Sequence, residues 1–153
     1  MIKILLFCHG NICRSTMAQY VFQNLIDRHN LTDQFYIDSA ATSREEIGNP
    51  IHHGTRRKLK ESAFHAVITA QPAAKSGNMT NLIYLIGMDS MNIRNMMRIL
   101  GSDTDGKVSK LLDFTERTGQ DIADPWYTGN FDRTYEDVKE GCEALLQDCL
   151  LRL

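Results

Sequence analysis

A cysteine and an arginine separated by five residues form the motif with the clearest chemical potential in this chain. Residues 8–15 read Cys-His-Gly-Asn-Ile-Cys-Arg-Ser. Arg14 carries a planar guanidinium that can bind two oxygens of a tetrahedral oxyanion. Cys8 supplies a sulfur nucleophile, and Ser15 can donate a hydrogen bond to its thiolate. These residue types on one loop indicate attack of sulfur on the phosphorus atom of a bound phosphate group.

Such chemistry requires a loop that is held between two rigid elements. Residues 2–7 are almost continuously apolar, which favours a strand buried on both faces. Gly10 and Asn11 tolerate left-handed backbone after this strand, and Ser15 can cap a following helix. The apolar face of that helix would consist of Ala18, Val21, Phe22, Leu25 and Ile26.

A loop in this position gathers positive potential from the backbone. Its N–H groups converge, and the N-terminus of the helix adds roughly half a positive charge. This field favours the thiolate of Cys8 over the thiol. We therefore expect a phosphate-binding loop around Cys8 and Arg14 that consists of His9, Gly10, Asn11, Ile12, Cys13 and Ser15.

A zinc site is an alternative reading of the same segment. Cys8, His9 and Cys13 are possible zinc ligands, but no second ligand pair has the usual zinc spacing. The adjacent histidines His52 and His53 lie in a polar loop and form a weak candidate by themselves. We therefore expect no metal ion and no cofactor.

The rest of the chain alternates between strand patterns and helix patterns. Strands are expected at residues 34–39, 66–69 and 81–88, helices around 56–60, after Asp89 and from Asp132, and mostly loop over 107–132. This alternation predicts an α/β fold, a single three-layer domain over residues 1–153. Its four-stranded parallel sheet would carry helices on both faces, with the phosphate-binding loop after strand 1. Ligands of such sheets bind at the carboxyl ends of the strands, where Cys8 and Asp89 are expected.

Composition excludes several classes of protein. The chain has 153 residues, of which 42% are hydrophobic and 24% charged, and this fits one globular domain. Its net charge of −2 argues against a nucleic-acid partner. No apolar run suits a signal peptide or reaches the roughly 18 residues of a membrane span. Four cysteines without the spacing of a secreted disulfide framework indicate a reducing compartment. We expect a cytoplasmic monomer without membrane insertion.

Four ordered blocks place the cysteine motif in a wider pattern. Residues 6–15 contain the motif, 37–43 read Ile-Asp-Ser-Ala-Ala-Thr-Ser, 88–92 read Met-Asp-Ser-Met-Asn, and 122–127 read Ile-Ala-Asp-Pro-Trp-Tyr. With these blocks the chain resembles the low-molecular-weight protein tyrosine phosphatases along nearly its whole length. The resemblance implies a phosphoric monoester hydrolase that removes phosphate from phosphotyrosine in protein substrates, through a cysteinyl-phosphate intermediate.

The resemblance also implies roles near the C-terminus. Asp124 would act as the general acid beside the catalytic Cys8 and Arg14, although an Asp-Pro pair by itself predicts only a turn. Trp126 and Tyr127 would form a wall against the phosphotyrosyl ring. The alternative for both aromatic residues is a surface position without a role.

Supporting roles follow from the same resemblance. Asn11 and Ser39 would hold the phosphate-binding loop in shape. Asp89 would join the hydrogen-bond network of the site, and it is equally suited to cap the helix that follows. Two segments depart from the family pattern: Glu45 stands where many relatives carry an aromatic residue, and residues 65–81 diverge, so His65 receives no role.

The remaining cysteines differ in their expected surroundings. In the family, the residue at Cys13 can form a reversible disulfide with the nucleophile and so protect it from irreversible oxidation. A buried, inert thiol is the alternative for Cys13. Cys142 and Cys149 share the apolar stripe of the last helix, so we expect both to pack in the core.

Two related activities are alternatives on the same loop. An arsenate reductase would relay oxidation through a mid-chain cysteine pair, but this chain has no cysteine between Cys13 and Cys142. A phosphoarginine phosphatase typically has threonine where Ile12 stands, and the bulkier Ile12 favours an aryl ester. A module that binds phosphate without catalysis is a third alternative. It would be favoured if the nucleophile or the acid were missing, and both are present.

Overall fold

The sheet that positions the cysteine motif is parallel, with four strands in the part of the chain that the structure describes. The structure is a computed structural model, and it describes residues 2–9, 13–42, 84–100 and 108–151. The strands are β1 (Ile2–Cys8), β2 (Phe35–Ala41), β3 (Tyr84–Gly87) and β4 (Val108–Lys110). They lie in the order β2-β1-β3-β4, and each neighbouring pair is parallel. The predicted α/β class with a four-stranded parallel sheet is confirmed.

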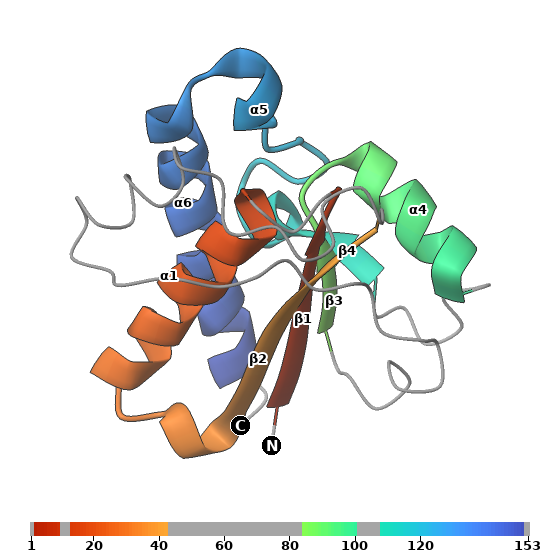
Figure 1. The fold of residues 1–153 in the computed structure, drawn as a ribbon. Helices are drawn as coiled ribbons and strands as arrows, with labels where there is room; N and C mark the ends of the chain where they lie inside the picture. The colour runs from red at the N-terminus through yellow and green to blue at the C-terminus, as the bar shows by residue number, and fades with distance from the viewer. Residues whose placement is uncertain (1, 10–12, 43–83, 101–107, 152–153) are drawn as a thin grey trace.

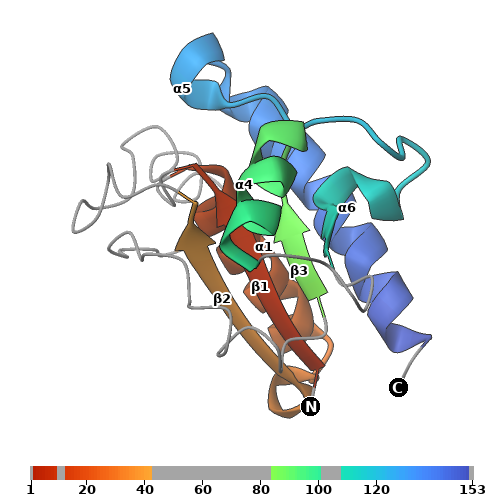
Figure 2. The same cartoon turned by 90° about the vertical axis from the view of Figure 1, so that its right-hand side faces the viewer.

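Helices cover both faces of this sheet. Figure 1 shows α1 (Arg14–Arg28) and α6 (Phe131–Leu150) on one side of the strands and α4 (Ser90–Leu100) on the other. Figure 2, turned by 90°, shows α4 in front of the strands and α1 behind them. Three short helices complete the described elements: η1 (Thr32–Gln34), η2 (Leu111–Phe114) and α5 (Pro125–Thr128).

The burial of β1 explains its continuous apolar sequence. Ile4, Leu6 and Cys8 face the core shared with α1 and α6, whereas Leu5 and Phe7 face the core shared with α4. Every residue of this strand except Lys3 is buried. A strand buried on both faces has no polar side to present, so the alternating pattern of a half-exposed strand is absent.

The last helix packs its cysteines inward, as expected. Cys142 and Cys149 are both fully buried. The Cys142 thiol donates a hydrogen bond of 3.6 Å to the carbonyl oxygen of Ala18 on α1. Gly141 lets η2 approach this helix closely, because a Cβ at this position would lie 2.5 Å from Cγ of Leu111.

Several expected boundaries are corrected by the structure. Helix α1 begins at Arg14 with Cys13 at its N-cap, so Ser15 lies inside the helix and does not cap it. The last helix begins at Phe131, because the Asn130 side chain accepts the Arg133 N–H at 3.0 Å and caps it. The strand expected near residues 34–39 runs to Ala41.

The expectation for the middle of the chain is partly wrong. Residues 107–132 were expected to be mostly loop, but they contain β4, η2 and α5. The strand expected at residues 66–69 and the helix expected around 56–60 lie outside the described residues. In the part of the chain that the structure describes, no helix is long and apolar enough to span a bilayer.

Candidate active site

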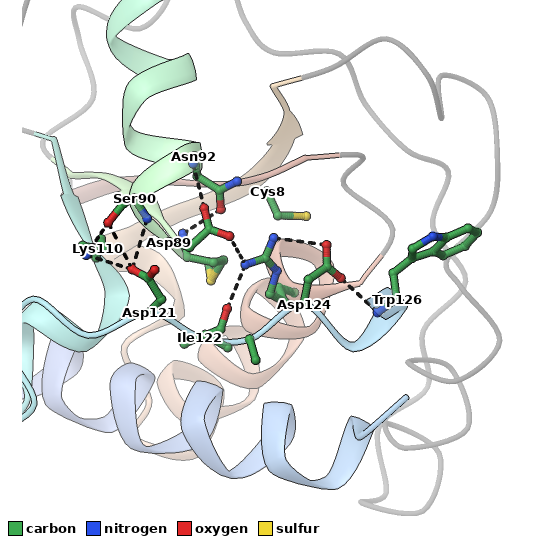
Figure 3. A network of polar contacts seen from close by, with 12 residues as sticks. Cys8, Asp89, Ser90, Asn92, Lys110, Asp121, Ile122, Asp124 and Trp126 are labelled. Carbon is green, nitrogen blue, oxygen red and sulfur yellow. Dashed lines mark hydrogen bonds and ion pairs between the residues drawn. The ribbon is translucent and has the colours of Figure 1, made fainter. Parts of the chain in front are cut away.

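Parallel strands bring the motif and a distant carboxylate to the same edge of the sheet. Cys8 is the last residue of β1, and Asp89 follows β3, which pairs with β1. The carbonyl oxygen of Cys8 accepts the N–H of Thr42 at 3.0 Å, which holds the end of β1 against the end of β2. Figure 3 shows Cys8, Asp89 and Asp124 around one site.

The thiol of Cys8 lies beside a hydroxyl from the first turn of α1. Its Sγ is 3.0 Å from Oγ of Ser15, and either atom can be the donor. Both residues are buried, Cys8 with 3% of its surface exposed. Helix α1 therefore starts with its N-terminus directed at the sulfur, where its partial positive charge stabilises an anion.

Arg14 connects three segments of the chain at this point. Its Nη1 donates to Oδ2 of Asp89 at 2.6 Å and to the carbonyl oxygen of Ile122 at 2.8 Å. Its Nη2 donates to Oδ2 of Asp124 at 3.4 Å. Only 2% of the Arg14 surface is exposed. Two carboxylates and a carbonyl group thus hold the two terminal nitrogens of the guanidinium.

The charge of this buried guanidinium is supported by its surroundings. Burial lowers the pKa of Arg14, but the charges of Cys8, Asp89 and Asp124 outweigh burial and raise the pKa above its ordinary value. Nε of Arg14 is buried, and no group in the described part of the chain accepts a hydrogen bond from it. A buried donor without an acceptor is unfavourable, so this atom is suited to bind an oxygen of a ligand.

Asp89 uses its two oxygens for two different purposes. Oδ2 accepts from Arg14, while Oδ1 accepts the N–H of Asn92 at 2.7 Å and caps the start of α4. Asn92 is itself buried, and its side-chain oxygen accepts the N–H of Met88 at 3.0 Å. The structure thus places Asp89 at both the network and the cap, and sequence reasoning missed the part of Asn92.

Asp124 has a similar arrangement at the start of α5. It is the N-cap of this short helix, with Pro125 in the first turn, and its Oδ1 accepts the N–H of Trp126 at 3.0 Å. Its side chain remains 21% exposed, so the carboxylate borders both Arg14 and solvent. Trp126 and Tyr127 are 56% and 82% exposed, and Figure 3 shows the indole of Trp126 beyond Asp124.

The other predicted residues of the site lie around this centre. Ser39 is buried on β2, and its hydroxyl donates to Oε1 of Gln19 on α1 at 2.5 Å. His9 is exposed at the end of β1, and Cys13 is buried against Phe131. Gly10, Asn11 and Ile12 lie outside the described residues. The structure brings together Cys8, Arg14, Ser15, Asp89 and Asp124, with Trp126 and Tyr127 beside the last of these.

Besides Asn92, sequence reasoning missed four contributors to the surroundings of this centre. The carbonyl oxygen of Ile122 contacts Arg14, and a polar cluster of Ser90, Lys110 and Asp121 lies behind Asp89. A backbone carbonyl leaves no sequence signal. Asp121 stands next to the block 122–127, but Lys110 lies in a strand of three residues, too short for a period-two pattern.

The fold and this arrangement define an α/β protein whose first strand ends at a thiol beside a buried arginine, as in a phosphate-binding loop. The chain belongs to the low molecular weight phosphotyrosine protein phosphatase family, whose model matches residues 3–151. The family expected from the sequence is confirmed.

Named relatives agree with this assignment. The low molecular weight protein-tyrosine-phosphatase YfkJ of Bacillus subtilis is 36% identical over 149 residues, which cover 95% of this chain and 94% of the relative. The crystal structure of YfkJ matches with a TM-score of 0.91 and 33% identity, over 99% of this chain and 96% of that one. A crystal structure of SP-PTP, a low molecular weight protein tyrosine phosphatase from Streptococcus pyogenes, has a TM-score of 0.81 and 36% identity, over 100% of this chain and 93% of that one.

Proposed function

We propose that this chain is a protein-tyrosine phosphatase that hydrolyses phosphotyrosine monoesters through a cysteinyl-phosphate intermediate. The observation that carries the proposal is the hydrogen bonding of the Arg14 guanidinium. Its two terminal nitrogens are fixed by Asp89, Ile122 and Asp124, while its buried Nε has no acceptor in the described part of the chain. A fixed guanidinium beside the Cys8 thiol is suited to receive a phosphate group.

In the first step the sulfur of Cys8 attacks phosphorus in line with the leaving oxygen. A phosphorus–sulfur bond forms, and the bond from phosphorus to the phenolic oxygen breaks. Asp124, as the carboxylic acid, gives its proton to that oxygen, so the substrate leaves as a neutral tyrosine side chain. Arg14 and the loop N–H groups stabilise the charge on the equatorial oxygens.

In the second step water hydrolyses the cysteinyl-phosphate. Asp124, now a carboxylate, accepts a proton from water while the water oxygen attacks phosphorus. The phosphorus–sulfur bond breaks, inorganic phosphate leaves, and the electron pair returns to Cys8 as thiolate. The hydroxyl of Ser15, 3.0 Å from the sulfur, is placed to donate a hydrogen bond to that thiolate as leaving group.

The surface beside Asp124 supports an aromatic substrate. Trp126 and Tyr127 are largely exposed next to the acid, and their rings offer area for a phosphotyrosyl ring. The partner in this proposal is a phosphotyrosine-containing protein, and Ser39 helps to shape the site from β2. We infer one catalytic domain over residues 1–153, in a reducing cytoplasm, because a thiolate nucleophile must stay reduced.

An arsenate reductase is less well supported by the geometry. That activity would need two further cysteines near Cys8, and the candidates Cys142 and Cys149 are fully buried on α6. Burial, with a contribution from the charge of Glu143, raises the pKa of Cys142, which keeps it as an unreactive thiol. A phosphoarginine phosphatase would use the same loop. A comparison of phosphate release from phosphotyrosine and phosphoarginine peptides separates the two activities.

The deciding experiment measures phosphate release from a phosphotyrosine peptide, a phosphoarginine peptide and phenyl phosphate. We expect wild type to hydrolyse the phosphotyrosine peptide and phenyl phosphate, and Cys8→Ser to release no detectable phosphate. Mass spectrometry of wild type quenched during turnover should find phosphate on Cys8. Full activity of Cys8→Ser would contradict the mechanism, and a preference for phosphoarginine would contradict the substrate.

A further inference from the structure

A polar cluster behind the site has no part in the mechanism above. We call Ser90, Lys110 and Asp121 the anchor cluster. Nζ of Lys110 donates to Oδ1 of Asp121 at 2.8 Å and to Oγ of Ser90 at 3.0 Å. The same Oδ1 accepts the N–H of Ser90 at 3.1 Å and its hydroxyl at 3.3 Å. One carboxylate oxygen thus joins β4 to the first residue of α4.

The cluster also holds the turn that leads into the acid segment. Nζ of Lys110 donates to the carbonyl oxygen of Gly119 at 2.7 Å, and the N–H of Gly119 donates to Oδ1 of Asp113 at 2.8 Å. Gly119 has a φ of 84°, a conformation that glycine adopts without strain. The chain therefore reverses at a fixed point, two residues before Asp121.

From this point the backbone runs directly to the site. The N–H of Ile122 donates to the carbonyl oxygen of Met88 at 2.9 Å, and the Ile122 carbonyl accepts from Arg14. Asp124 follows two residues later. On the other side of the anchor cluster, Ser90 directly follows Asp89. The cluster therefore fixes the backbone next to both carboxylates that contact Arg14.

The cluster lies apart from the groups that take part in the reaction. Figure 3 shows Lys110, Ser90 and Asp121 on the side of Asp89 that faces away from Asp124. The Lys110 side chain is 14% exposed and that of Asp121 49% exposed, so the pair borders solvent. Burial raises the pKa of Asp121, but hydrogen bonds and charge from Lys110, with the donors of Ser90, outweigh it and lower this pKa overall.

We propose that Lys110 and Asp121 are positioning residues for the general acid, through their hold on the segment that carries Ile122 and Asp124. This inference rests on the proposed phosphatase function and deepens it. Small displacements of a catalytic group reduce its contribution strongly, because proton transfer needs a short, aligned contact. Loss of the anchor should therefore weaken protonation of the leaving oxygen more than it weakens phosphate binding.

The test compares leaving groups that differ in their need for a proton. Phenolate is a much stronger base than p-nitrophenolate, so phenyl phosphate depends more on the acid. For Lys110→Met we expect kcat/KM to fall about tenfold with phenyl phosphate and much less with p-nitrophenyl phosphate. The inhibition constant of inorganic phosphate should stay unchanged. Asp121→Asn, which keeps the acceptor for Ser90, should show the same selective loss to a smaller extent.

Arg117→Met is the matched control. Arg117 lies on the same stretch of chain and pairs with Asp137 and Glu140 of α6, so its loss removes an ion pair without releasing the acid segment. We expect it to leave the ratio of the two kcat/KM values unchanged. In the double variant Lys110→Met with Asp121→Asn, kcat/KM for phenyl phosphate should fall no further than in Lys110→Met, because both changes break the same contact.

Three results would overturn this inference while leaving the phosphatase function intact. The first is an equal fall of kcat/KM with both substrates in Lys110→Met. The second is an unchanged kcat/KM in this variant. The third is a rise of the phosphate inhibition constant in proportion to the fall of kcat/KM. No turnover of either aryl phosphate by wild type, or full turnover by Cys8→Ser, would instead overturn the phosphatase function and the inference together.

Discussion

Arg14 and Asp89 are joined by a contact of 2.6 Å between Nη1 and Oδ2, although 75 residues separate them in the chain. The second oxygen of the same carboxylate caps α4 through the N–H of Asn92. One side chain therefore serves two purposes, to orient the guanidinium and to start the helix. These two purposes can be separated by the choice of substitution.

Asp89→Ser keeps a good helix cap, and Asp89→Ala does not. We expect both variants to lower kcat/KM for phenyl phosphate by about tenfold or more, because both release one side of the Arg14 guanidinium. Urea denaturation should find Asp89→Ala less stable than Asp89→Ser by about 1 kcal/mol, the usual contribution of a cap. Kinetics of Asp89→Ser equal to those of wild type would contradict the orienting role.

Arg14→Lys keeps the positive charge but loses the planar fork. Lysine cannot contact Asp89, Ile122 and Asp124 while it also binds two phosphate oxygens. We expect kcat/KM to fall by about 10²–10³, as for the loss of a transition-state donor. The inhibition constant of inorganic phosphate should rise in Arg14→Lys and stay unchanged in Arg117→Lys. Wild-type kinetics of Arg14→Lys would show that the positive charge is sufficient and would contradict the need for the planar guanidinium.

Asp124→Asn separates the acid from the helix cap, because asparagine also caps well. The thermal midpoint should stay close to that of wild type. We expect kcat/KM for phenyl phosphate to fall by about 10²–10⁴, with a smaller loss for p-nitrophenyl phosphate. An equal loss with both substrates would assign Asp124 a structural role only.

Gly141→Ala should destabilise the protein, although alanine favours a helix more than glycine does. The new Cβ would lie 2.5 Å from Cγ of Leu111, so the contact between η2 and α6 must open. We expect a loss of about 1–3 kcal/mol in the free energy of unfolding, the usual effect of overpacking. In a Leu111→Ala background the same change should be stabilising by up to about 1 kcal/mol. A loss of equal size in both backgrounds would refute the steric explanation.

The lowered pKa of Asp121 predicts a pH dependence of stability. Because the folded state holds this pKa below the ordinary value of 3.8, the pair with Lys110 stabilises the fold above that value and loses its effect as the pH falls through the folded pKa. The gap in unfolding free energy between wild type and Asp121→Asn should therefore close at low pH. We expect a gap below about 1 kcal/mol at neutral pH, because the side chain is half exposed. A gap that is constant with pH would contradict this origin.

The centre of the site could be predicted where its geometry is local. The apolar run of β1 and the helix after it place Cys8 and Arg14 on one loop, and no distant contact is needed to see this. Asp124 is different, because 110 residues separate it from Arg14 and an Asp-Pro pair by itself indicates only a turn. Only the resemblance to a family assigned its role.

Other features could not be predicted because tertiary contacts decide them. Ser15 is a good helix cap by type, but α1 already begins at Arg14, so its hydroxyl makes the expected contact with the Cys8 thiol from inside the helix. Strand β4 has three residues and takes its shape from pairing with β3, so its sequence shows no period. Lys110, Asp121 and Ser90 contact one another only because β4 and α4 lie together, and no local sequence pattern indicates this packing.

The contacts of Arg14 also set when the site can exist during folding. Its partners Asp89, Ile122 and Asp124 follow it by 75, 108 and 110 residues. A nascent chain that has not yet released residues 122–124 from the ribosome carries the thiol, the arginine and Asp89, but it lacks the other two partners of the guanidinium, Ile122 and Asp124. The complete set of contacts around Arg14 therefore requires synthesis to proceed at least to Asp124.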